Sequence, residues 1–246
     1  MTAFNSSAAP KSSVDPDFAY PKTVSKNAKA ALQTAIAKED WATATETTIQ
    51  YVTANNLISH ENVVNGFKTI DSISIVAPNK WKPVFQLIEA EIYNTIYNSI
   101  RRKADSRTIP LDSVPQNPYE WSKNIFADKV YSICKGIIDS KENTSTPLNE
   151  WNLFLTDTSE SYRAGLTVEE FLLRKSFQLL NEYADPAKDI IPFFTNNNET
   201  ATPAQKCASL RDKAIDMLID KTSSLHQSLF LAKTLVSKCD VLPYSQ

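Results

Sequence analysis

The amino-acid sequence predicts an all-α protein made of stacked antiparallel helical hairpins. Apolar residues recur every three or four positions in successive segments of about 15 to 20 residues, which is the period of one helix face. Glycine, which β-hairpin turns and bulges use for positive φ, occurs only 3 times in 246 residues. The composition therefore argues against a sheet-rich fold.

The first two helices are expected to form a hairpin. The first begins at Tyr20 and Pro21, because proline suits the first turn of a helix. The second begins after Asp40, which is a favourable N-cap. Residues 1–19 are rich in Ser, Ala and Pro, and we expect them to be a disordered tail.

Ser59 is expected to cap a third helix, which should end before Pro78, and Asn79 is expected to cap the fourth. The fourth helix has the most regular apolar pattern in the chain. A fifth helix is expected to run from Tyr119 through Trp121 to Ile137, after a proline-bearing loop. Helical spacing predicts burial of one set of core residues: Trp81, Phe85, Ile88, Ile92, Trp121, Ile125 and Phe171.

The second half of the chain shows two further helix starts. Thr167 and Glu170 have the spacing of a capping box, and Thr202 followed by Pro203 is a cap and first-turn proline. Thr146 and Pro147 give the same signal for a short segment over 148–155. The stretch 185–200 reads as an irregular connector, and a last helix is expected over 225–236.

Successive helices joined by short connections favour a tetratricopeptide-like or α-solenoid arrangement, although no clean repeat of about 34 residues is present. We expect residues 20–246 to form a single helical domain, with a sub-boundary near 185–202. The four tryptophans are interpreted as residues that fill hairpin interfaces.

Composition excludes several function classes. The net charge is −2, with basic and acidic residues interspersed, which argues against nucleic acid as a partner. No stretch approaches the ~20 apolar residues of a membrane-spanning helix, so no membrane insertion is expected. The first residues lack the charged and apolar regions of an export signal, and the scarcity of glycine argues against phosphate-binding loops.

No enzyme chemistry is expected from the residues. The two histidines, His60 and His226, belong to no zinc-binding pattern. The cysteines Cys134, Cys207 and Cys239 are widely separated, as buried thiols would be. Carboxylates such as Glu89 and Glu91 are interpreted as solvated helix surface. We therefore expect no catalytic residue, no cofactor and no metal.

Half-exposed aromatic side chains are the remaining candidates for a partner-binding surface. Tyrosine tolerates a position that is partly wet, and the alternative interpretation is packing between hairpins. The candidates are Tyr93, Tyr97, Tyr119, Tyr131 and Tyr162.

A family resemblance supplies a more specific expectation. Residues 88–93, Arg107 with Thr108, and the block 118–129, which reads PYEWSKNIFADK, resemble the N-terminal helical region of bacterial alpha-2-macroglobulin-like proteins of Bacteroides. Shorter matches occur at 20–25, at 162–163 and at 166–172. The match covers roughly residues 20–184, with a weaker continuation to the end of the chain.

The resemblance implies a non-enzymatic scaffold or docking domain from a larger envelope protein of an endopeptidase-inhibitor and defence family. It implies a periplasmic or outer-membrane-associated location, and protein partners or other domains of the same parent chain. The family's β-domains are missing from this sequence, so we expect the chain to be part of a larger protein. The runner-up hypothesis is an independent tetratricopeptide-like adaptor that binds a peptide or protein.

Overall fold

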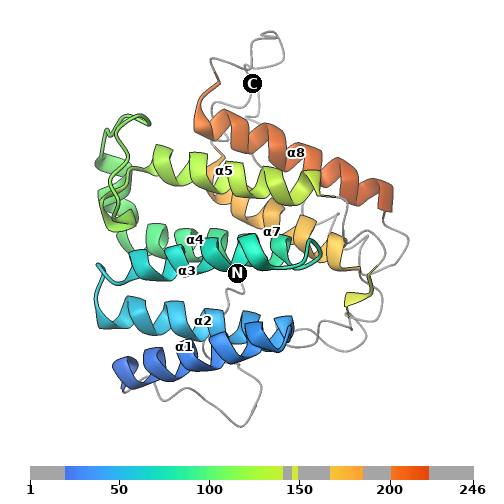
Figure 1. Ribbon diagram of the computed structural model, residues 1–246. Coiled ribbons are helices and arrows are strands. Elements are labelled where there is room, and N and C mark those ends of the chain that lie inside the picture. The colour runs from blue at the N-terminus through green and yellow to red at the C-terminus, as the bar shows by residue number, and fades with distance from the viewer. Residues whose placement is uncertain (1–19, 141–145, 149–166, 185–200, 222–246) are drawn as a thin grey trace, which may run out of the picture.

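The computed structural model describes residues 20–140, 146–148, 167–184 and 201–221. These residues form seven α-helices and one 3-10 helix, and no strand occurs among them (Figure 1). One isolated antiparallel bridge joins Pro147 to Thr167. The prediction of an all-helical fold is confirmed. The tail 1–19 and the segments expected at 149–155, 185–200 and 225–236 lie outside the described residues.

Helices α1 (Pro21–Ala37) and α2 (Trp41–Ile58) pack against each other as a hairpin at the bottom of Figure 1. Pro21 lies in the first turn of α1, as predicted. Asp40 caps α2, because its carboxylate accepts hydrogen bonds from the Thr43 backbone N–H at 3.1 Å and from the Thr43 hydroxyl at 2.7 Å. This confirms the cap and the start of the second helix.

The turn between α1 and α2 is a Schellman motif. The Asp40 N–H donates to the Ala35 carbonyl at 2.9 Å, and the Glu39 N–H donates to the Ile36 carbonyl at 3.0 Å. Glu39 adopts φ 56°, the left-handed region that glycine usually occupies at this position. The sequence thus places a residue with a Cβ where the backbone favours glycine.

Replacing Glu39 with Gly is expected to raise the free energy of unfolding by about 0.5–1 kcal/mol, because glycine removes the left-handed strain but adds chain entropy. Urea denaturation followed by circular dichroism measures the change. Glu39→Ala is the matched control, since it removes the carboxylate and keeps the Cβ. An equal gain in the free energy of unfolding from both substitutions would show that the effect comes from the carboxylate charge. It would contradict the explanation by backbone strain.

Helices α3 (Val63–Val76) and α4 (Lys82–Ser106) follow. The end of α3 before Pro78 is as predicted. Ser59 does not cap α3, because a turn intervenes and the N-cap position is Asn62, whose N–H bonds to Ser59. The start predicted for α4 is also wrong. Asn79 does not cap this helix, whose N-cap position is Trp81. Pro83 explains the later start, because proline has no N–H and is tolerated only within the first turn.

The predicted start of the fifth helix at Tyr119 is also wrong. A 3-10 helix, η1 (Pro118–Glu120), comes first, and α5 (Lys123–Asp139) begins after Ser122. Trp121 lies between them in extended backbone, with φ −69° and ψ 152°.

Helices α7 (Val168–Tyr183) and α8 (Pro203–Lys221) begin where their caps predict. The Thr167 hydroxyl accepts from the Glu170 N–H at 3.2 Å, and Glu170 accepts from the Thr167 N–H at 2.8 Å. Thr202 and Gln205 make the same reciprocal pair at 3.3 and 2.9 Å. Both helices therefore begin with a capping box.

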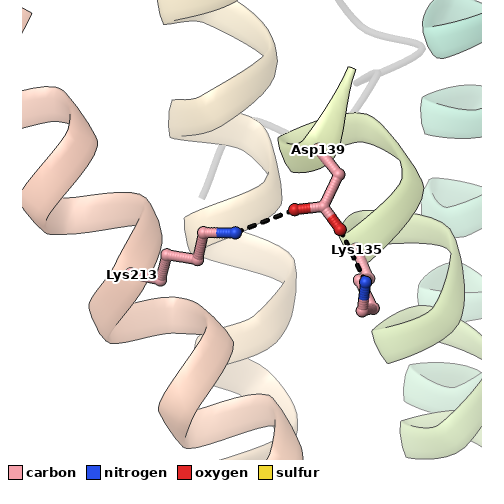
Figure 2. Close-up of polar contacts among 3 residues, drawn as sticks. All are labelled: Lys135, Asp139 and Lys213. Carbon is pink, nitrogen blue, oxygen red and sulfur yellow. Dashed lines mark hydrogen bonds and ion pairs between the residues drawn. The ribbon is translucent and has the colours of Figure 1, made fainter. Parts of the chain in front are cut away.

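Helix α8 is held to α5 by an exposed ionic contact. Asp139, at the end of α5, accepts from Lys135 at 2.6 Å and from Lys213 of α8 at 2.8 Å (Figure 2). These hydrogen bonds, that of Lys135 first, lower the pKa of Asp139. Since all three side chains are exposed, the contact orients α8 and contributes little to stability.

A single buried core connects all seven helices. Five of the seven residues predicted to be buried are in it, and the prediction is wrong for Ile92 and Phe171, which are half-buried. Ile92 faces a groove between α2 and α4, and Phe171 lies in the first turn of α7. The five buried residues are Trp81, Phe85, Ile88, Trp121 and Ile125.

Candidate functional site

A half-open groove of about 230 Å³ lies between α2 and α4, and we call it the α2–α4 groove. Most of its wall is aliphatic, and the polar side chains among its lining residues are one carboxylate, one amide and two hydroxyls. The lining residues are Ile49, Val52, Thr53 and Asn56 of α2 and Ile88, Glu91, Ile92, Thr95 and Ile96 of α4.

Glu91 is the one ionisable residue among those lining this groove. Its side chain is only 13% exposed, and its Oε1 lies 3.8 Å from Nζ of Lys175 on α7. Burial raises the pKa of Glu91, and the charge of Lys175 acts in the opposite direction. Desolvation of the carboxylate therefore outweighs its ion pair.

One end of the groove is joined to η1 through Asn56. The Tyr119 hydroxyl donates to Oδ1 of Asn56 at 2.6 Å. The imidazole of His60 stacks on the Tyr119 ring, with the centroids 3.6 Å apart and the planes at 7°. His60 is exposed in the turn before α3, where it covers an aromatic face. His226 lies outside the described residues.

The connector between α4 and α5 is fixed by Arg107. Its Nη1 donates to the carbonyl of Tyr119 at 2.7 Å and to that of Trp121 at 3.2 Å. The Trp121 indole N–H donates to the carbonyl of Pro115 at 2.6 Å. These bonds explain why α5 starts after Trp121, because carbonyls that bind the guanidinium are turned away from a helical ladder.

Aromatic rings link this connector to four helices. The rings of Phe67 and Tyr93 stack at 4.2 Å, and the rings of Tyr93 and Trp121 stack at 5.0 Å. Such pairs add about 0.5–1.5 kcal/mol each beyond the area they bury. We call the linked set the aromatic chain, which consists of Phe67, Tyr93, Trp121, Phe126, Tyr97 and Tyr183.

Of the candidate tyrosines, Tyr93 and Tyr97 are buried, with 6% and 0% of their surface exposed. Both belong to the aromatic chain, and the Tyr97 hydroxyl donates to Asp105 at 2.8 Å. The structure does not place the five tyrosines on one exposed surface.

Tyr119 and Tyr131 are half-buried, on η1 and α5 respectively. Tyr119 packs against His60, and the Lys206 ammonium lies 5.9 Å from the centre of the Tyr131 ring. Tyr162 lies outside the described residues. Tyr119 alone of these two has a direct contact, through Asn56, with a residue that lines the groove.

The sequence did not predict the α2–α4 groove or the position of Glu91 within it. The sequence predicts Glu91 on solvated surface, but its side chain is only 13% exposed and lines the groove with Ile88 and Ile92. Helical periodicity could have identified this wall of the groove, because positions 88, 91, 92, 95 and 96 share one helix face. A carboxylate on an otherwise apolar stripe is the pattern that distinguishes this site.

Glu89, two positions before Glu91, is half-buried rather than solvated. Burial, and then the negative charge of Asp71, raises its pKa to about 7. The Tyr93 hydroxyl and Lys129 favour the charged form but do not offset the desolvation. Glu89 therefore binds a proton more tightly in the folded chain than in the unfolded chain.

Glu89 should make stability fall as the pH rises from its ordinary pKa of 4.5 to about 7, since only the folded state retains the proton in this window. Glu89→Gln keeps an acceptor for Tyr93 and is expected to raise the free energy of unfolding by about 1–2 kcal/mol near pH 8, after discounting for partial exposure. The gain should vanish near pH 4.

Urea denaturation across this pH range checks the prediction, with the exposed Glu61→Gln as control. Parallel stability curves for Glu89→Gln and the unaltered protein would contradict it.

The described thiols are poorly suited to nucleophilic chemistry. Cys134 and Cys207 are both fully buried. Burial raises the pKa of Cys207 to about 12 and that of Cys134 further still. Both side chains are therefore protonated at neutral pH, whereas the thiolate is the reactive form.

Within the described ranges, no three His, Cys, Asp or Glu side chains gather closely enough to hold a metal ion. Of the helices described, none combines the length and apolar character needed to cross a bilayer.

No protein-family model, no curated protein and no solved structure matches this chain.

Proposed function

We propose that this chain is a non-enzymatic helical scaffold or docking domain, which holds protein segments in place. The observation that carries the proposal is that the most distinctive residues of the sequence, Arg107 and Trp121, have structural contacts. Arg107 and Trp121 are occupied by carbonyl bonds and ring packing in the α4–α5 connector. Side chains used in this way support a rigid frame rather than catalysis.

The parent protein that we propose is an alpha-2-macroglobulin-like envelope protein of the endopeptidase-inhibitor and defence family. The resemblance rests on residues 88–93, 107–108 and 118–129, and these three segments meet in one structural unit. A periplasmic or outer-membrane-associated location and docking to other domains of the parent belong to the same proposal.

An antibody raised against this chain tests the parent and the location together. Immunoblots of fractionated native cells should show a protein far heavier than the 27.5 kDa of this chain, in the envelope fraction. A band at the mass of the chain itself, in the cytosolic fraction, would overturn the proposed parent and favour an independent adaptor.

The alternative function is a tetratricopeptide-like adaptor in an α-solenoid arrangement. The α2–α4 groove favours it, because a half-open aliphatic groove between helices suits an extended peptide. In both hypotheses this chain binds a polypeptide segment. The segment belongs to the same parent protein in the first hypothesis and to a different protein in the second.

The chain alone is expected neither to trap nor to capture a protease covalently. Thioester-bearing relatives in the resembled family use a Cys-x-Glu-Gln motif, and none of the three cysteines here is followed by it. Incubation with a broad-specificity protease, followed by cleavage assays on large and small substrates, measures trapping. Selective protection of the large substrate, or a conjugate stable in SDS, would contradict the prediction.

A further inference from the structure

The lining of the α2–α4 groove restricts what can occupy it. Ile49 and Val52 of α2 face Ile88 and Ile92 of α4 across an aliphatic space, and Glu91 supplies the one ionisable group among the lining residues. An occupant must therefore offer aliphatic surface to the walls and a hydrogen-bond donor or a positive charge to the carboxylate, since a buried acceptor without a partner is costly.

Glu91 has capacity for a second partner. Its distance of 3.8 Å from Lys175 is longer than a direct hydrogen bond of about 2.7–3.2 Å. Burial raises the pKa of Glu91 even with this lysine beside it, so the charge is only partly compensated. A cation that contacts Glu91 from the groove side would compensate the rest of its negative charge.

The size of the groove suits a single side chain of a partner better than a whole helix. A volume of about 230 Å³ is smaller than the roughly 300–1,000 Å³ of most ligand pockets, and a helix is about 10–12 Å across. Lysine carries a compact ammonium on a flexible aliphatic stem that packs well on apolar surface. Arginine binds a carboxylate best when its planar fork contacts both oxygens, and Oε1 of Glu91 already faces Lys175.

We propose that the α2–α4 groove binds a lysine side chain of an extended, apolar segment of a partner polypeptide. The stem lies between the isoleucines of α2 and α4, and the ammonium donates to Glu91. Asn56, tied to Tyr119 at the end of the groove, is placed to bond the main chain of the same segment. This inference rests on the proposed docking function and names the chemistry of its partner.

Two peptides that differ only in the ammonium test the proposal. Acetyl-Leu-Lys-Leu-amide and its norleucine analogue are titrated separately into the isotopically labelled full chain, and amide NMR shifts are followed. The lysine peptide should bind at least about tenfold more tightly. The largest shifts should fall on Val52, Asn56, Ile92 and Ile96, with n-butylamine binding more weakly than the peptide.

Glu91→Gln should abolish the preference for lysine while leaving norleucine binding unchanged, and Glu61→Gln, outside the groove, should alter neither. Circular dichroism confirms that both variants are folded. Equal binding of the two peptides, shifts elsewhere, or a preference that survives Glu91→Gln would overturn the proposal. The mass and location of the native protein test the proposed function separately, so each can fail without the other.

Discussion

Replacing Trp121 with Ala is expected to lower the free energy of unfolding by about 3–5 kcal/mol, as large-to-small changes of buried aromatic residues do. The indole is 4% exposed and stacks on Tyr93. It also packs against Phe126 and donates to the carbonyl of Pro115 at 2.6 Å. The substitution removes ring contacts and that bond together, and it leaves a cavity between α4 and α5.

Urea denaturation measures this effect, and Trp121→Phe is the matched control. Phenylalanine keeps a ring in the aromatic chain and loses the indole N–H, so the expected cost is about 1–2 kcal/mol. A midpoint that Trp121→Ala leaves unchanged would show that the ring does not support the core.

Replacing Arg107 with Ala is expected to cost about 2–3 kcal/mol, because the side chain makes two charge-assisted hydrogen bonds to carbonyls. Those bonds go to Tyr119 at 2.7 Å and to Trp121 at 3.2 Å. Without the guanidinium, both carbonyls lose a partner, and the connector loses the group that holds its two ends together.

Arg102→Ala is the control, since Arg102 is exposed on the same helix, and it should change stability by less than about 0.5 kcal/mol. Hydrogen exchange gives a second measurement, because the bonded amides of Tyr119, Glu120 and Trp121 should lose protection in Arg107→Ala alone. Equal effects of the two substitutions would indicate a general charge effect instead.

The helix starts that depend on local bonds were predictable from the sequence. Asp40, Thr167 and Thr202 each bond to a backbone N–H only three positions away, so the residue pattern contains the whole interaction. The capping boxes and the hairpin of α1 and α2 follow from such signals and from helical periodicity.

The connector and the groove were not predictable in the same way. Arg107 binds carbonyls 12 and 14 residues away, and no local rule pairs them. The groove needs α2 and α4 to lie side by side, although they are separated by a third helix in the chain. Periodicity identified the stripe of α4, but only tertiary packing decides which of its tyrosines are buried.

The aromatic chain bears on where this protein could be divided into separate domains. Loops rich in proline, such as residues 107–118, are usual places to look for the border between two domains. Here a cut in that loop would separate Tyr93 from Trp121 and Tyr97 from Phe126, and it would expose rings on both fragments. The described helices on either side of the loop share one buried core, so we expect either half expressed alone to expose apolar surface and to aggregate.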